Sequence, residues 1–386
     1  MNVLEEVRQH QEHLIGLRRN FHRHPELSWN ENRTQRVICR ELDELEIPYE
    51  TVCNTGVIAV LQGSNRGPVI GLRADMDALP ITEKSGAEYA SQTPGVMHAC
   101  GHDCHVAMLL VAARILKAHE SELHGTVKLI FQPAEEVIEG ARFMCALPQL
   151  ADVQRIFGIH VWIDLSVGTF SVEPGPRMAS ADNIYLTVRG KSAHGAQPHQ
   201  SADAIVAACG VVSALQTVVS RNVNPLEPAV VTIGTIAGGT SSNIIANEVK
   251  LSGTVRSFCP DVRDAMENRL KEVCCTTAQA YGTTCDFEYR RCTPATINEA
   301  ASTEIAQKAV AQLFGKEAMV HLEKTTGGED FAWFLERIPG CYLFVGARNE
   351  ENGRCWPHHH ECFDIDEKAL VNGTAVLVQI GLSAGV

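Results

Sequence analysis

The sequence lacks a clustered basic segment, an unbroken apolar run of membrane-spanning length and a low-complexity linker. Its formal net charge of −13 argues against a nucleic-acid partner, because phosphate binding needs a clustered Lys/Arg surface. No stretch of about 18 consecutive apolar residues occurs, so we expect no membrane span. Without a tethering tract, any second domain should be inserted compactly.

The first 20 residues also lack the apolar core of a secretory signal and instead carry charges at helical spacing. We therefore expect a cytoplasmic protein, in which the 14 cysteines are free thiols rather than disulfides. A chain of 386 residues with 45% hydrophobic content can bury a sizeable core. Because chains of this length usually form more than one hydrophobic core, two domains are expected.

The first part of the chain alternates amphipathic helices with short apolar runs that end in polar residues. Three such runs are 69–74 before Asp75 and Asp77, 126–131 before Glu135 and Glu136, and 156–159 before His160. Runs of this length beside helical patterns are typical of buried parallel strands in an open α/β sheet. In such sheets the ligand site lies beyond the carboxyl ends of the strands, where these titratable residues are expected.

The pattern changes from about residue 183 to residue 291. The expected elements are a strand at 185–188, a helix at 202–219, strands at 229–236 and 248–258, a helix at 262–281 and a strand at 285–289. The order β-α-β-β-α-β predicts a ferredoxin-like α+β module. We therefore expect an α/β catalytic domain formed by residues 1–182 and 292–386, with an inserted domain at 183–291.

Cys100 and His102 lie one residue apart in an expected loop before a helix. Thiolate and imidazole are favoured ligands of zinc and similar metals, and Asp103 is placed to hydrogen-bond a ligating imidazole. Taken alone, the Cys-x-His pattern is a weak signal, because most such residues bind nothing.

Glu135 and Glu136 follow an apolar strand and a proline. One carboxylate can bind a metal while its neighbour takes a proton from the attacking water, as hydrolysis requires. The alternative is a solvated pair that opens a helix. His160 and the run His358-His359-His360 could complete a two-metal cluster, although the run could also be a surface tract and its spacing does not choose among the three imidazoles.

The motifs together resemble the M20 metallopeptidase family, and within it the D subfamily of N-acyl amino acid amidohydrolases. The resemblance spans essentially the whole chain and rests on segments 21–27, 73–80, 97–103, 132–136, 158–160, 192–194, 253–256 and 328–331. It implies two divalent metal ions, for which manganese, zinc, nickel and cobalt are candidates. The ligands that it implies are Cys100, His102, Glu136, His160 and His359, the last counted back from Phe363, with His360 its rival.

The same resemblance implies a catalytic role for three further residues: Glu135 as general base, Asp77 as a site-orienting residue and His194 as the residue that stabilises the oxyanion. Asn243 and Arg256 would help to hold the substrate carboxylate. The inserted module corresponds to the family's dimerisation domain, so a homodimer is expected.

The resemblance implies hydrolysis of an N-acyl amino acid, with an acetyl, benzoyl or longer acyl group, to a carboxylic acid and a free amino acid. A dipeptidase, carboxypeptidase or carbamoylase could use the same site. A catalytically silent metal-binding scaffold is the alternative from another class. The sequence does not identify the acyl group, the amino acid or the metal.

Overall fold

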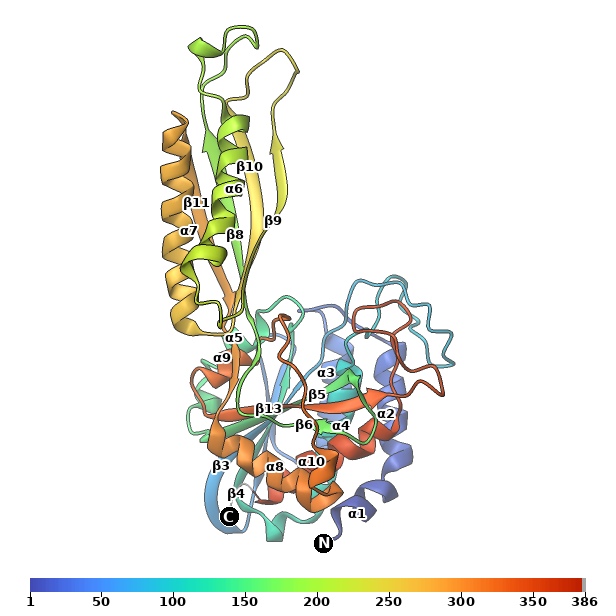
Figure 1. Cartoon of the computed structure of the whole chain (residues 1–386). Helices are drawn as coiled ribbons and strands as arrows, with labels where there is room; N and C mark the ends of the chain where they lie inside the picture. Colours follow the sequence, from blue (N-terminus) through green and yellow to red (C-terminus); the bar gives the residue numbers. More distant parts are fainter. Residues whose placement is uncertain (384–386) are drawn as a thin grey trace. The chain divides into compact units, whose positions relative to one another are not determined.

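The computed structural model describes residues 1–383 and divides into two compact units (Figure 1). Unit 1 comprises residues 1–175, 297–323 and 330 onward, and unit 2 comprises residues 176–296 and 324–329. Each unit buries an apolar core of its own. Two separate cores are the usual mark of two domains.

Unit 1 contains a seven-stranded, mostly parallel sheet. Its strands are β1 (Tyr49–Val52), β2 (Gly56–Gln62), β3 (Asn65–Asp75), β4 (His124–Gln132), β5 (Arg155–Ser166), β6 (Phe170–Ser171) and β13 (Gly340–Arg348). They lie in the order β1-β2-β4-β3-β5-β13-β6. The central strands β4, β3, β5 and β13 are parallel, and the outer pairings are antiparallel. The expected α/β class is confirmed.

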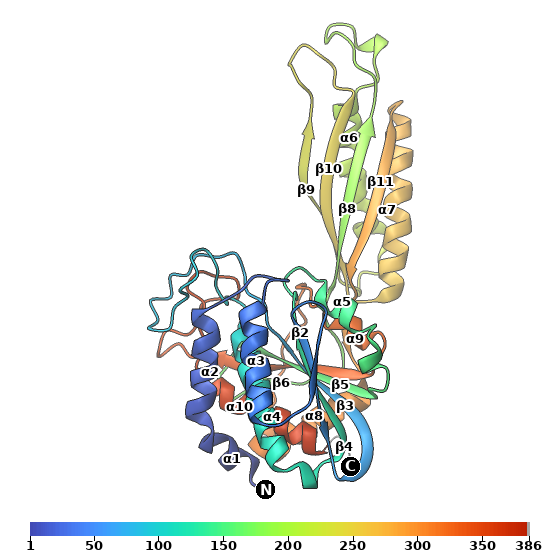
Figure 2. The ribbon, with the colours of Figure 1, turned by 180° about the vertical axis from the view of Figure 1, so that it is seen from behind.

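The helices of unit 1 surround this sheet. They are α1 (Val3–Gln9), α2 (Gln11–Arg23), α3 (Asn32–Glu44), α4 (His102–Ala118), α5 (Gly140–Met144), α8 (Ala300–Phe314), α9 (Ala332–Leu335) and α10 (Lys368–Ser383), with short 3-10 turns η1 (Glu120–Glu122), η2 (Pro148–Leu150) and η4 (Lys316–Ala318). Helix α4 is buried along most of its length, because α2, α3, α10 and the sheet all contact it (Figure 2). His102 is therefore the first residue of the most enclosed helix of the unit.

Unit 2 has the expected ferredoxin-like order. Its elements are β8 (Ser180–Arg189), η3 (Pro198–Gln200), α6 (Ala204–Asn222), β9 (Ala229–Gly238), β10 (Glu248–Ser257), α7 (Pro260–Ala280) and β11 (Thr284–Thr293). The strands form an antiparallel sheet in the order β11-β8-β10-β9. The remaining strands, β7 (Gly175–Met178) and β12 (Thr296–Asn298), pair with each other.

Helix α6 is, among the described residues, the one helix long and apolar enough to cross a membrane by length and composition. Gly, Ser, Gln and Thr interrupt its apolar sequence, so a search for an unbroken run misses it. Its buried residues Ala207, Val211 and Leu215 recur at helical spacing and belong to the core of unit 2. This is the pattern of an amphipathic helix packed on a sheet.

Candidate metal centre

The candidate site of unit 1 lies where its parallel strands end. Asp75 is the last residue of β3, and β4 ends three residues before Glu135. The prediction that His160 closes its strand is wrong, because β5 continues to Ser166. β3 pairs with β5 only as far as Gly158, so His160 lies beyond the pairing with β3 while β13 still supports it.

Cys100 belongs to two groups of potential metal donors. One group contains Cys100, His102 and His160, and the other contains Cys100, Glu136 and His359. Within each group the donor atoms lie within 4.8 Å of one another. The structure therefore gathers all five predicted ligands around a single thiol.

Buried atoms without partners test whether these residues fit a metal. The Nε2 atom of His102 and the Oε1 atom of Glu136 are buried and have no hydrogen-bond partner among the described residues. His102 Nε2 lies 3.8 Å from that Oε1 atom. An unsatisfied buried polar group costs roughly 1–3 kcal/mol, which a coordinated cation would offset. The thiol, imidazole and carboxylate set suits a borderline divalent metal.

The hydrogen bonding of His160 also fits coordination. Its Nδ1 atom lies 2.6 Å from the carbonyl oxygen of Val161, which can only accept, so Nδ1 carries the proton. The Nε2 lone pair then faces Cys100 Sγ at 3.4 Å. Burial, assisted by the nearby His105 and His358, holds the pKa of His160 well below its usual value. The ring is therefore the neutral form that metals bind.

The three C-terminal imidazoles have different surroundings. His358 is half-buried, and its Nε2 atom accepts the Ile163 amide at 3.3 Å. His359 Nε2 lies 3.6 Å from a carboxylate oxygen of Glu136. His360 instead stacks on Trp356, with ring centroids 4.4 Å apart. The geometry thus favours His359 over its rival.

The backbone around Glu135 and Glu136 is fixed on both sides. Ala134 and Ile138 have φ angles of 56° and 61°, a left-handed conformation that β-branched residues rarely adopt. The backbone N–H groups of both glutamates donate to the Asp77 carboxylate at 3.0 Å. The buried Asp77 carboxylate therefore helps to hold this strained turn in one conformation.

The two glutamates differ in their surroundings. Burial raises the pKa of Glu136 to about 7, although the nearby His102 opposes the shift. Glu135 has its Oε2 atom 3.9 Å from His102 Nε2, while its Oε1 atom accepts the Asp330 amide at 3.4 Å. A carboxylate beside the donor groups is in position to exchange a proton with a molecule bound there.

Asp77 lies beside His102, whereas Asp103 binds other residues. Asp77 lies 3.3 Å from His102 Nδ1, which leaves Nε2 facing Glu136. Burial alone would lower the pKa of His102, but the carboxylates of Asp75, Asp77 and Glu136 outweigh it and raise that pKa to about 10. The sequence placed Asp103 against a ligating imidazole, but its carboxylate binds Arg18 and His22.

Sequence reasoning missed a buried network beneath these donors. His105 Nε2 accepts the Val161 amide at 3.0 Å, so its Nδ1 atom carries the proton and donates to Asp75 at 2.5 Å. Arg73 donates to the other oxygen of Asp75. Asp75 is thus engaged by two donors. The sequence indicated that Asp75 lies at a strand end, but it did not indicate these two hydrogen-bond donors.

Three predicted residues belong to unit 2. His194 forms an isolated bridge with Ile244, and the neighbouring Gly195 amide donates to the Asn243 carbonyl at 2.8 Å. Arg256 lies on β10, between Ala181 of β8 and Val230 of β9. Their contribution to catalysis stays a prediction.

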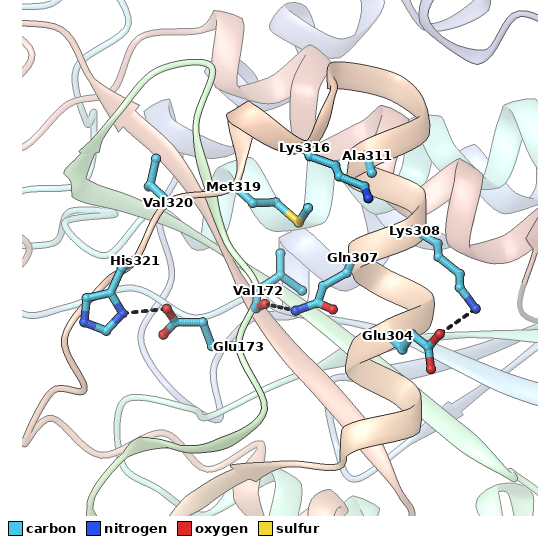
Figure 3. Close-up of a pocket in the computed structure, with 10 residues that line it drawn as sticks. All are labelled: Val172, Glu173, Glu304, Gln307, Lys308, Ala311, Lys316, Met319, Val320 and His321. Carbon is cyan, nitrogen blue, oxygen red and sulfur yellow. Dashed lines mark hydrogen bonds and ion pairs between the residues drawn. The ribbon is translucent and has the colours of Figure 1, made fainter.

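A cavity of about 510 Å³ on unit 1 involves none of the predicted residues (Figure 3). It lies between α8 and the segments around Val172 and Val320. Glu173 pairs with His321 at 2.7 Å, and Glu304 pairs with Lys308 at 2.8 Å. The lining therefore contains both acidic and basic side chains.

The chain is similar to known proteins over most of its length. The family model of peptidase family M20/M25/M40 matches residues 71–382. N-acetylcysteine deacetylase of Bacillus subtilis is 41% identical over 96% of this chain and 96% of its own length. Thermostable carboxypeptidase 1 of Saccharolobus solfataricus is 36% identical over 95% of this chain and 94% of its own. A crystal structure of a Bacillus subtilis dinuclear metal binding peptidase from the M20 family has a TM-score of 0.87 and 37% identity, covering 98% of this chain and 100% of that one.

Proposed function

The chain belongs to peptidase family M20/M25/M40, and from this premise we propose that it is a two-metal amidohydrolase that splits N-acyl amino acids into a carboxylic acid and a free amino acid. The observation that carries the proposal is the pair of donor groups that share Cys100. The 41% identical N-acetylcysteine deacetylase supports the choice of substrate class.

Cys100, His102, Glu136, His160 and His359 would hold two divalent ions. When bound, such ions polarise an amide carbonyl and make water more acidic. The soft thiol favours zinc, cobalt or nickel, whereas manganese would be selected by its availability. Elemental analysis of protein purified without added metal tests this choice.

Side chains carry out the proton transfers and bind the substrate and the oxyanion. Glu135 removes a proton from the attacking water and delivers it to the leaving nitrogen, which then departs as a free amine. His194 donates a hydrogen bond to the oxyanion of the tetrahedral intermediate. Asn243 and Arg256 hold the substrate carboxylate. Asp77 keeps His102 and the Glu135 backbone in position.

A carboxypeptidase is the second candidate, and the 36% identical thermostable carboxypeptidase supports it. Release of primary amine from hippurate, N-acetyl amino acids and dipeptides, measured side by side, separates the two. We expect faster release from the N-acyl amino acids. Preferential cleavage of dipeptides would favour the peptidase, and bound metal without hydrolysis of any of these would favour a silent scaffold.

We also propose that the protein is a cytoplasmic homodimer that pairs through residues 183–291. β9 is an edge strand of the unit 2 sheet and exposes Val230 and Ile236, which supports a surface that pairs with a second copy. Analytical ultracentrifugation of the full chain tests the dimer. A monomer across the micromolar range would contradict it.

A further inference from the structure

The two chain segments that supply Cys100, His102 and His359 are joined close to these ligands. The His359 amide donates to the Ala99 carbonyl at 2.8 Å. The Phe363 ring packs beside Gly101, where a methyl group would lie 3.7 Å from it. Both contacts connect the segment 99–103 with the segment 359–364, although more than 250 residues separate them in sequence.

Arg18 of α2 makes a third connection between these segments. Its Nε atom donates to Asp103 at 2.9 Å, and its Nη2 atom donates to Asp364 at 2.8 Å. Asp103 is the residue after His102, and Asp364 follows Phe363. One guanidinium thus binds a carboxylate on each ligand-bearing segment.

The surroundings of Arg18 hold it rigidly. Its side chain is fully buried, and its third donor, Nη1, reaches Glu367 at 3.4 Å. Its guanidinium lies 4.7 Å from the centre of the Tyr89 ring, and the Tyr89 hydroxyl donates to Asp364 at 2.7 Å. The planar fork of arginine can bind two carboxylates in fixed directions, which a lysine ammonium cannot do.

Stability alone does not account for such a group. Desolvating a buried ion pair can cost more than its attraction returns, and apolar replacements are often equally stable. In some proteins a buried charge network instead fixes one arrangement of the segments that it joins. We propose that Arg18 is a positioning residue of the metal centre, which sets the spacing of His102 and His359 through Asp103 and Asp364. This inference rests on the proposed metal site.

The test compares two conservative variants, Arg18→Lys and Arg263→Lys. Arg263 offers a matched control, because it donates to the buried Asp182 at 2.8 Å and 2.6 Å within unit 2. Metal-free protein is titrated with Co²⁺, and the thiolate-to-cobalt absorption of Cys100 is followed. Changes in groups that orient metal ligands typically weaken metal binding about 10- to 100-fold. We expect that loss in Arg18→Lys and wild-type affinity in Arg263→Lys.

The outcomes are distinct. Wild-type affinity in a folded Arg18→Lys variant overturns the inference, and so does an equal loss in both variants, which would indicate general destabilisation. If Arg18→Lys does not fold, Tyr89→Phe removes one donor to Asp364, and unchanged Co²⁺ affinity in that variant overturns the inference. Wild-type protein that binds no Co²⁺ contradicts the proposed function itself.

Discussion

Glu135 and Glu136 are adjacent in the sequence but have different neighbours in the folded chain. Glu136 lies near Cys100 and His359, whereas Glu135 accepts the Asp330 amide and lies beside His102. Which of the two would bind metal was predicted only through a family resemblance, because spacing alone cannot assign neighbouring carboxylates. The sequence could not reveal the Asp77 contacts that fix both backbones, since these depend on the fold.

Replacing Glu135 by Gln removes the proposed proton carrier while keeping the shape of the side chain. We expect kcat to fall by about 10²–10⁴, the usual contribution of general acid–base catalysis, with metal content unchanged. Glu139→Gln is the control, because Glu139 is exposed on the same turn and binds Trp29. A near-normal rate in Glu135→Gln would remove that residue from its role.

The raised pKa of His22 predicts that the stability of the fold depends on pH. Burial alone would lower its pKa, but Asp103 and Glu83 outweigh this effect and raise the pKa from 6.5 to about 8. A raised pKa stabilises the fold fully below pH 6.5, and this stabilisation is lost as the pH rises through about 8. The free energy of unfolding should fall by about 2 kcal/mol over this pH range. Urea unfolding at pH 6 and pH 9 should show it in the wild type and much less in His22→Gln; equal pH dependence in both would contradict the assignment.

The turn at Gly101 separates two proposed ligands, Cys100 and His102. Gly101 has a φ angle of 90° between Cys100 and His102, and an added methyl group would lie 2.5 Å from Val161. Helix α4 begins at His102, directly after this glycine. Apolar periodicity could not locate that start, because His102, Asp103 and His105 are polar yet buried by tertiary contacts.

We predict that Gly101→Ala disrupts this turn. Left-handed backbone strain and overpacking should together destabilise unit 1 by about 2–4 kcal/mol and weaken metal binding. Gly86→Ala is the matched control, since Gly86 also has a positive φ, 71°, but has open space around its Cα. The Gly86→Ala variant should lose about 1 kcal/mol of stability through backbone strain and keep its metal. Thermal unfolding and metal content measure both; equal behaviour of the two variants would show that the contact with Val161 is unimportant.

The arrangement of the elements was more predictable than their ends. The alternation of apolar runs indicated the parallel strands, and the order of elements indicated the ferredoxin-like unit. The extension of β5 past His160 was not predictable, because it depends on pairing with β13, which lies about 180 residues away in sequence.

At the scale of the whole molecule, all five proposed ligands belong to unit 1. Metal removal should therefore destabilise unit 1 selectively. An ion present at about 100 times its dissociation constant stabilises the folded state by about 2.7 kcal/mol. Hydrogen exchange after chelation should increase in residues 97–103 and 358–364, whereas α6 and α7, in the core of unit 2, should keep their protection. Uniform loss of protection would contradict this separation.

The proposed two-metal centre requires that Cys100 be shared by both ions. Elemental analysis of the purified wild type and of Cys100→Ala measures this most directly. We expect two divalent ions per wild-type chain and the loss of both from Cys100→Ala, because each donor group would lose its common ligand. A Cys100→Ala protein that retains two ions would contradict the claim.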